Sequence, residues 1–234
     1  GAQIKPGNKF LKEKYVTEHI EGLDEQLYSS PATQVFYETP KKIVNKVTSP
    51  DLGMMYSMNP YQGCEHGCIY CYARNTHEYW GFNAGLDFES KIIAKKSAPV
   101  LLEKFILHPD WHALPISLSG NTDCYQPLER KLEITRGILK VLANYRHPVG
   151  IITKNSLILR DLDLLTDLAK DNLVHVYISI TTLNEDLRGT MEPRTVSAVK
   201  RLKIVTMLSN AGVPVGIMNA PVIPGLNDHE IPGI

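Results

Sequence analysis

Three cysteines in one short segment are the residues of this chain best suited to metal chemistry. Cys64, Cys68 and Cys71 lie within residues 63–72, Gly-Cys-Glu-His-Gly-Cys-Ile-Tyr-Cys-Tyr, in a C-x3-C-x2-C arrangement. Thiolates this close together repel one another unless they share a cation, and thiolates favour soft metals. Three ligands leave a fourth coordination position open, which is typical of a catalytic rather than a structural metal centre. The segment therefore predicts a metal site with an open position.

A zinc site is an alternative interpretation of the same residues. Zinc accepts mixed sulfur and nitrogen ligands, so His66, His77 or Cys124 could complete a set of four with the three cysteines. No second C-x2-C pair follows in the sequence, whereas small zinc modules commonly carry one. The residues alone leave both interpretations open.

The composition indicates a soluble globular protein. The chain has 234 residues, 43% hydrophobic and 21% charged, with 25 basic and 25 acidic side chains. This balance gives no general support for nucleic-acid binding. No apolar run reaches the roughly 18–20 residues of a membrane span, and the first residues lack the apolar region of a signal peptide. Four cysteines, three of them clustered, do not resemble a disulfide framework, so we expect a reducing, cytoplasmic location.

Residues 1–50 are expected to form an N-terminal extension rather than a domain. They are polar and interrupted by turn-forming pairs such as Pro6-Gly7, with short apolar pieces at 34–37 and 43–47. An extension that wraps the core and a partly ordered arm are the two interpretations. The pattern changes at residue 51, and we expect a single core over residues 51–234.

Strands and helices are predicted to alternate from residue 51 onward. Short apolar, β-branched stretches bounded by turn residues predict strands, and apolar residues three or four apart predict helices. The predicted strands are 54–58, 115–119, 149–153, 174–180 and 213–218, and segment 90–107 begins as a strand and becomes helical after Pro99. The predicted helices cover 129–145, a segment through Leu162, Leu165 and Leu168, and 197–210.

This alternation predicts an α/β fold with a parallel sheet. Strands separated by helices of 10–15 residues are typical of βαβ units. The nearly continuous Val and Ile residues of the strands favour burial on both faces of the sheet. Five such strands within about 165 residues are too few for a closed eight-stranded barrel, which needs roughly 250 residues.

Polar residues follow the end of each predicted strand. In parallel α/β folds, ligands bind at the carboxyl ends of the strands. The first strand leads into the cysteine segment, and the other four lead into residues 119–129, 153–155, 179–194 and 219–228. Because these ends should meet at one edge of the sheet, the sequence predicts the functional site there.

Several of these segments together resemble the radical SAM superfamily. The cysteine triplet with Tyr70 before its third cysteine is similar to the signature of that superfamily. The segments Gly-x-Thr-Asp-x-Tyr-Gln-Pro-x-Glu, Ile-Thr-Lys, Ser-x-Thr-Thr-Leu, Glu-Pro-Arg-Thr and Ala-Pro-Val-Ile-Pro-Gly-Leu-Asn-Asp are similar to its spore photoproduct lyase-related branch, also described as DNA repair photolyase-like. The resemblance covers residues 51–228, and the segments occur in the expected order.

The resemblance implies a partial (β/α)6 barrel of parallel strands, similar to an open TIM barrel. Six strands are expected in such a core. The chain ends at Ile-Pro-Gly-Ile234, where the superfamily has the helix that leads to strand six. We therefore expect this core to be incomplete at its C-terminal end.

The resemblance also implies the chemistry. In radical SAM enzymes three cysteines bind a 4Fe–4S cluster, and its fourth iron binds the amino and carboxylate groups of S-adenosylmethionine (SAM). An electron, supplied by a reductant such as flavodoxin or ferredoxin, cleaves SAM to a 5′-deoxyadenosyl radical that abstracts hydrogen from a substrate. The substrate here is not implied. Repair of a nucleic-acid lesion is one hypothesis, and a non-catalytic zinc- or cluster-binding sensor or scaffold is the alternative function.

The resemblance assigns expected roles to individual residues. Cys64, Cys68 and Cys71 correspond to the ligands of the cluster, and Tyr70 corresponds to a residue that contacts the adenine. The other expected SAM contacts are Ser119, Gly120 and Asn121 for the methionine ammonium, Asp123 beside them, Lys154 and Arg194 for the carboxylate, Ser179 for the ribose or carboxylate, and Val222 and Ile223 for the adenine.

Structural alternatives exist for several of these assignments. Cys124 could return a hydrogen atom to a product radical, as a cysteine near this edge does in the lyase, or it could be a buried inert thiol. Lys154 could be an exposed lysine at a strand end, and Ser179 a bonded strand hydroxyl. Arg194 could form an ion pair with Glu192 or Asp186.

Overall fold

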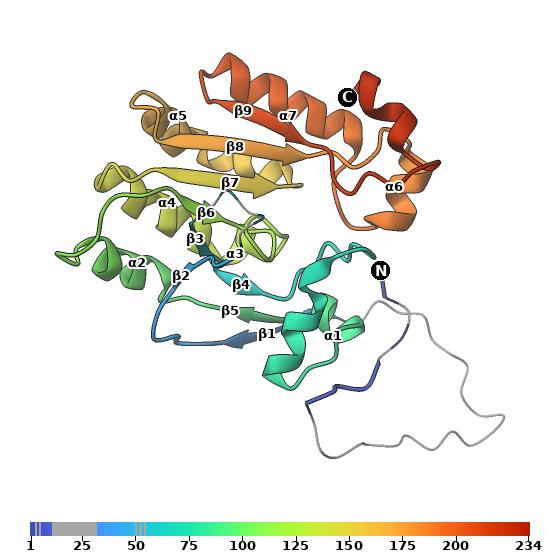
Figure 1. The fold of residues 1–234 in the computed structure, drawn as a ribbon, viewed down its shortest axis with the longest axis horizontal. Coiled ribbons are helices and arrows are strands. Elements are labelled where there is room, and N and C mark those ends of the chain that lie inside the picture. Colours follow the sequence, from blue (N-terminus) through green and yellow to red (C-terminus); the bar gives the residue numbers. More distant parts are fainter. Residues whose placement is uncertain (3, 5, 11–31, 50, 52, 54) are drawn as a thin grey trace.

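A six-stranded sheet is the main layer of the structure, a computed structural model that describes residues 1–2, 4, 6–10, 32–49, 51, 53 and 55–234 (Figure 1). The sheet has the order β2-β3-β6-β7-β8-β9. Its strands are β2 (Val44–Lys46), β3 (Tyr56–Met58), β6 (Ile116–Leu118), β7 (Val149–Thr153), β8 (Val174–Ser179) and β9 (Val215–Met218). A second sheet has the order β1-β5-β4, with β1 (Gln34–Tyr37), β4 (Tyr61–Gln62) and β5 (Lys91–Ala94).

The strands β3, β6, β7, β8 and β9 are parallel, and only β2 runs antiparallel to its neighbour in this sheet. The predicted α/β fold with a parallel sheet is therefore confirmed. The strands predicted from residue 115 onward are confirmed with small shifts at their ends. For the predicted strand 54–58, Met54 lies outside the described residues and β3 covers Tyr56–Met58.

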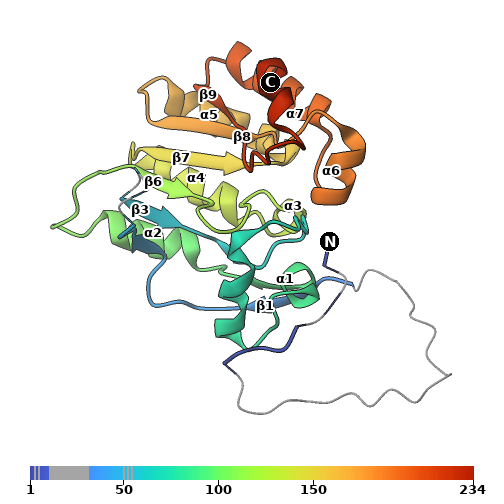
Figure 2. The ribbon, with the colours of Figure 1, turned by 45° about the vertical axis from the view of Figure 1, so that its right-hand side comes forward.

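Helices cover one face of the main sheet. Figures 1 and 2 show α4, α5 and α7 behind the strands. The helices are α1 (Leu86–Ser90), α2 (Ala98–Ile106), α3 (Glu129–Leu132), α4 (Ile134–Asn144), α5 (Leu162–Ala169), α6 (Glu185–Met191) and α7 (Ala198–Asn210). Three 3-10 helices are η1 (Tyr72–Trp80), η2 (Ser156–Asp161) and η3 (Asp228–Gly233).

The predicted helix 129–145 is two helices, because the chain turns sharply at Glu133. This residue has a left-handed backbone conformation, with φ of 52°. The carboxylate of Glu129 then accepts the N–H groups of Thr135 (3.0 Å) and Arg136 (3.3 Å), which begin α4. These first N–H groups have no partner inside the helix, so a buried carboxylate is a fitting acceptor.

The main apolar core lies between the sheet and the helices. In β7, Val149, Ile151 and Thr153 are buried against the helices, while Ile152 is half-buried on the opposite face. In β8 the same alternation leaves Tyr177 37% exposed. In β6 all three residues are buried, which agrees with the prediction that both faces of the strands are buried. For β7 and β8 this prediction is wrong, because the helices pack on one face alone.

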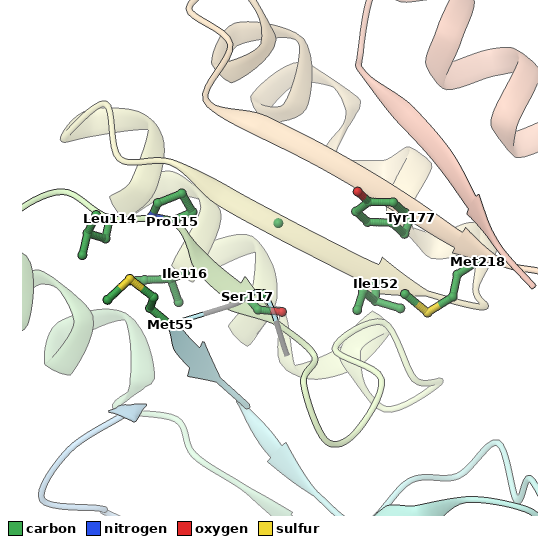
Figure 3. A pocket seen from close by; sticks show the side chains of 10 residues that line it. Met55, Leu114, Pro115, Ile116, Ser117, Ile152, Tyr177 and Met218 are labelled. Atoms are coloured by element: carbon green, nitrogen blue, oxygen red, sulfur yellow. The ribbon is translucent and has the colours of Figure 1, made fainter. Parts of the chain in front are cut away.

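The opposite face of the sheet carries an apolar hollow of about 350 Å³ (Figure 3). Met55, Leu114 and Pro115 lie at one end of this hollow, and Tyr177 and Met218 lie toward the other. Ser117 of β6 and Gly150 of β7 line the hollow, and because these residues are small they leave this space unfilled. The hollow continues toward the carboxyl ends of the strands.

The two apolar pieces of the N-terminal extension become strands. Residues 34–37 form β1, which pairs in parallel with β5, and β2 pairs with β3 at the edge of the main sheet. Segment 90–107 forms β5 and α2, which confirms its predicted change from strand to helix. Within the described residues, the main sheet is open, with β2 and β9 as its edge strands. None of the described helices is long and apolar enough to cross a membrane.

The close approach of α2 and α4 depends on Gly137. A Cβ at Gly137 would lie 2.9 Å from Cγ of Pro99 in α2, whereas a Cβ at Gly189 in α6 would meet no atom within 4 Å. We expect Gly189→Ala to raise the free energy of unfolding by about 0.5–1 kcal/mol through helix propensity. Gly137→Ala should lower it by about 1 kcal/mol, because the overpacking outweighs the same gain. Urea unfolding of the two variants tests this, and equal stabilisation by both would contradict it.

Candidate functional site

A cavity of about 340 Å³ lies where the cysteine segment meets the carboxyl ends of β6 to β9. It brings together many of the residues predicted from the sequence. The predicted residues that line it are Cys64, Cys68, Tyr70, Cys71, Ser119, Asn121, Asp123, Lys154 and Ser179. Its other lining residues are His66, Tyr72, Thr122, Ile152, Thr153, Met218, Ala220 and Pro221. Because Ile152 and Met218 also border the apolar hollow, the two spaces adjoin.

The cysteine segment is held in place through its backbone. The N–H of Cys64 donates to the carbonyl of Phe88 (2.9 Å), and Nε2 of Gln126 donates to the carbonyl of Gly63 (3.2 Å). The guanidinium of Arg74 donates twice to the carbonyl of Cys68 (3.2 and 2.8 Å). These bonds use backbone groups, so they fix the segment while the thiols stay available.

A buried carboxylate behind the segment gathers two arginines. Glu89 accepts hydrogen bonds from Arg74 (2.6 Å), from Arg194, and from the N–H of Ala2 (2.6 Å). Burial opposes ionisation of Glu89, but these three donors hold its pKa below the usual value. Arg194 also donates to the carbonyl of Glu65. Arg194 is therefore an ion-pair partner of Glu89 that supports the segment, and it does not line the cavity as predicted for a carboxylate ligand.

The three thiols lie in an environment with little water. Cys64 and Cys68 are buried and Cys71 is half-buried. Burial raises the pKa of all three thiols, and the pKa of Cys68 rises to about 12. A bound cation would favour the thiolates instead, so metal binding should release protons. In the described part of the chain, no three Cys, His, Asp or Glu side chains are arranged to hold a single metal ion.

Asp123 connects the ends of β6 and β7. Its carboxylate accepts from the hydroxyl of Thr153 (2.8 Å) and from the backbone N–H groups of Lys154 and Tyr125 (2.8 Å each). Nδ1 of His66 lies 3.4 Å from the same carboxylate. Asp123 therefore lies at the predicted edge, where its oxygens are occupied by protein donors.

Lys154 is an anchored cation on the wall of the cavity. Its Nζ donates to the hydroxyl of Ser179 (2.5 Å), lies 3.7 Å from Glu192 and stands 5.9 Å from the centre of the Tyr70 ring. Glu192 is fully buried and also bonds Tyr70 and Arg201. Although burial opposes ionisation, the charges of Lys154 and Arg201 and the hydrogen bond from Tyr70 lower the pKa of Glu192 to about 2.

Sequence reasoning did not assign a role in the site to Glu192 or Arg201. Glu192 belongs to the segment Glu-Pro-Arg-Thr, which the resemblance did single out for its arginine. The carboxylate of that segment faces the site, and its arginine faces the cysteine segment from behind. The position of Glu192 shortly after a predicted strand was the available signal in the sequence. Its burial, which makes the charge important, is visible only in the structure.

Other predicted residues do not line the cavity. The side chain of Cys124 is fully buried in the main apolar core, and its N–H donates to the hydroxyl of Ser119 (2.8 Å). The carbonyl of Gly120 accepts from the hydroxyl of Tyr72. Val222 is 41% exposed, and the N–H of Ile223 is bound by Asn227 (2.6 Å). Their expected roles toward SAM stay predictions.

The two histidines considered as zinc ligands lie in different surroundings. His66 lines the cavity between Asp123 and the amide of Asn155, whose Nδ2 is 3.3 Å from Nε2 of the histidine. His77 is fully buried and packs against the rings of Phe82 and Phe88, and neither of its ring nitrogens has a hydrogen-bond partner among the described residues. His77 and Cys124 do not line the cavity with the three cysteines.

Comparison with known sequences places the chain in a family. The profile of the radical SAM superfamily matches residues 58–234. An uncharacterised protein of Mycobacterium bovis is 36% identical over 189 residues, which are 80% of this chain and 56% of that protein. An uncharacterised protein of Methanocaldococcus jannaschii is 30% identical over 190 residues, 81% of this chain and 68% of that protein. The chain therefore belongs to the radical SAM superfamily, which confirms the resemblance.

Solved structures of spore photoproduct lyase share the fold. The lyase complexed with dinucleoside spore photoproduct has a TM-score of 0.61 and 16% identity, covering 81% of this chain and 52% of the lyase. A single-residue variant of the lyase has a TM-score of 0.61 and 15% identity, covering 84% and 57%. The chain thus spans about half the length of the lyase and of the Mycobacterium bovis relative.

The donor set of the cavity fits the cofactors that the superfamily implies, a 4Fe–4S cluster and SAM. Each thiolate ligand of such a cluster binds a different iron, so the thiols surround the cluster instead of converging on one ion. Cys64, Cys68 and Cys71 all line this one cavity. The same cavity presents the Lys154 ammonium, which suits a carboxylate.

The tight packing behind the cysteine segment can be tested at Gly67. Its φ is +68°, and an added Cβ would lie 2.1 Å from Nη2 of Arg194 and 2.7 Å from Oε2 of Glu89. Gly81 has a similar φ of +79° with no atom within 4 Å of an added Cβ. Both alanine variants carry the cost of a left-handed backbone, about 1 kcal/mol. Only Gly67→Ala also displaces the Arg194–Glu89 pair, so its total loss should be about 3 kcal/mol.

Thermal unfolding and iron content distinguish the two glycine variants. We expect Gly67→Ala to lose stability and to retain less iron per chain, and Gly81→Ala to retain iron like the unaltered protein. Equal iron content in both variants would contradict a role for this packing in shaping the cysteine segment.

Proposed function

We propose that this chain is the core of a radical SAM enzyme that cleaves SAM reductively to a 5′-deoxyadenosyl radical, which abstracts hydrogen from a substrate. The single observation that carries the proposal is that the cysteine triplet and an anchored lysine line one cavity at the strand ends.

The residues that line the cavity would have different roles in this reaction. Cys64, Cys68 and Cys71 would hold the cluster, which when bound supplies the electron that cleaves SAM; a flavodoxin or ferredoxin is the reductant we expect. Lys154 would bind the methionine carboxylate. The hydroxyl of Ser179 accepts a hydrogen bond from the ammonium group of Lys154 and holds it in place. Apolar side chains that line the same cavity exclude water, which protects a reactive radical from side reactions. These wall residues are Ile152, Met218, Ala220 and Pro221.

Nucleoside release tests this proposal. The full-length protein, reconstituted without oxygen, should contain iron and sulfide and should release 5′-deoxyadenosine from SAM after reduction with dithionite. Cys68→Ala should abolish release, whereas Cys124→Ala should retain SAM cleavage because Cys124 lies in the apolar core. One zinc per chain without sulfide would favour the alternative of a non-catalytic metal protein, and no nucleoside from the cluster-loaded protein would overturn the proposal.

The role of Lys154 can be tested by its affinity for SAM. Lys154→Met removes the ammonium but keeps most of the side-chain volume. The lost hydrogen bond between charged groups, about 1.5–3 kcal/mol, should raise the Kd for SAM roughly 10- to 100-fold. Lys170→Met is the control, since Lys170 is 73% exposed at the end of α5. Equilibrium dialysis measures both, and an unchanged Kd for Lys154→Met would contradict the assigned role.

A nucleic-acid substrate is the finer candidate, supported by one feature of the cavity. Tyr72 lines it, is 73% exposed, and is anchored by the bond from its hydroxyl to Gly120. An exposed aromatic ring at the mouth of a site can stack on an unpaired base. The lyase neighbour was solved with a dinucleoside photoproduct, which supports the same substrate class here by analogy.

Single-stranded DNA binding tests this candidate. Fluorescence anisotropy with a labelled oligonucleotide should show weaker binding by Tyr72→Ala, by about tenfold or less for one stacked base. Tyr145→Ala is the control, because Tyr145 is also exposed but does not line the cavity. Equal binding by both variants, or none by the unaltered protein, would count against a nucleic-acid substrate.

A further inference from the structure

We propose that Glu192 is a positioning residue for SAM, which holds Lys154 and Tyr70 in the orientation that SAM binding requires. This inference rests on the proposed function and assigns a role to a carboxylate that does not itself contact the ligand. It also gives Arg201, which is fully buried, a place in the same network.

The two oxygens of Glu192 face different groups. Oε1 accepts from the hydroxyl of Tyr70 and from the hydroxyl of Thr181 (2.7 Å), and lies 3.7 Å from Nζ of Lys154. Oε2 accepts from Nη2 of Arg201 (2.5 Å). Oε1 therefore contacts Tyr70 and Lys154, which line the cavity, and Oε2 is bound by Arg201 of α7.

The groups around Glu192 come from four separate segments. Tyr70 belongs to the cysteine segment, Lys154 follows β7, Thr181 follows β8, and Arg201 lies in α7. Arg201 also donates to the carbonyl at the end of β8, Ser179 (2.9 Å). A buried carboxylate that connects four segments fixes their relative positions, because each partner would otherwise have to leave a charge or a polar group unpaired in the interior.

Lys154 depends on this arrangement for its orientation. A lysine side chain has a long, flexible stem and loses much rotamer freedom when it is held in one place. The ammonium of Lys154 has three N–H groups; one bonds Ser179, and Glu192 attracts a second. Among the described residues no other acceptor bonds this ammonium, so the third N–H group can bind a carboxylate in the cavity, which the side chain lines and in which it is 17% exposed.

A glutamine at position 192 could not keep all of these contacts. Its amide has one acceptor oxygen and one NH2 donor, and Arg201 and Lys154 have only donors to offer. One of these two cations must then lose the carboxylate oxygen that it faces, and Lys154 keeps only Ser179 as an acceptor, whereas Arg201 keeps Thr195 and the carbonyls of Val196 and Ser179. We therefore expect Glu192→Gln to raise the Kd for SAM about tenfold through the release of Lys154, a loss comparable to one weakened hydrogen bond between charged groups.

A double-mutant cycle in the full-length, cluster-loaded protein tests the inference. The Kd for SAM is measured by equilibrium dialysis for the unaltered protein, Glu192→Gln, Lys154→Met and the double variant. If Glu192 acts through Lys154, its substitution should raise the Kd about tenfold when Lys154 is present and should add little when methionine replaces Lys154. A residue that only stabilises the fold would raise the Kd by the same factor in both backgrounds.

Glu129 offers a matched control elsewhere in the fold. It is also fully buried and bonds an arginine, Arg160 (2.7 Å), but its side-chain partners Tyr61 and Arg160 do not line the cavity, whereas Tyr70 and Lys154 beside Glu192 do. Glu129→Gln should lower the melting temperature and leave the Kd for SAM unchanged. A similar rise in Kd for Glu129→Gln would show that any damaged buried carboxylate weakens SAM binding, and would overturn the assignment of Glu192.

The remaining outcomes separate this inference from the proposed function. An unchanged Kd for Glu192→Gln, with a raised Kd for Lys154→Met, would overturn the positioning role alone. Failure of the unaltered protein to bind SAM would overturn the proposed function as well. If Glu192→Gln does not fold, Glu192→Asp takes its place in the cycle, because it keeps the charge but withdraws the carboxylate by one methylene group.

Discussion

Charges buried at the carboxyl ends of the strands set the geometry on which the rest of this site depends. Glu192 has no contact with water, so its charge is tolerable only while Arg201, Lys154 and Tyr70 surround it. Each of these groups belongs to a different part of the chain, and the network therefore forms only when the sheet, α7 and the cysteine segment are all in place. The same contacts that complete the fold present a lysine to the cavity.

A second buried carboxylate with cationic partners supports the cysteine segment from the side away from the cavity. Glu89 gathers Arg74 and Arg194 behind the segment, and both arginines then bind its backbone carbonyls. Glycine at position 67 leaves the space that Arg194 occupies. The three cysteines line the cavity on the other side of the segment. Fold stability and ligand geometry are thus coupled through two buried carboxylates.

Local patterns in the sequence predict the parallel strands well, but not the contacts between distant segments. β7 and β8 follow from their runs of Val and Ile. The pairing of β1 with β5 depends on residues more than fifty positions apart. The break between α3 and α4 depends on a carboxylate that binds the next helix, a contact that helical periodicity does not contain.

The candidate site shows the same division. The cysteines, Lys154 and Ser179 are predicted from short segments whose residue types and spacing are recognisable without the rest of the chain. All of them line one cavity. Arg194 is expected to contact SAM, but its side chain pairs with Glu89. Glu192 has no predicted role, because its carboxylate bonds groups as distant along the chain as Tyr70, 122 positions away. The proposed site depends above all on one feature: three thiols bind three irons of the cluster, and the fourth iron stays open to SAM. The electron paramagnetic resonance spectrum of the reduced full-length protein tests it most directly: addition of SAM should change the signal of the cluster, and an identical spectrum with and without saturating SAM would contradict the account.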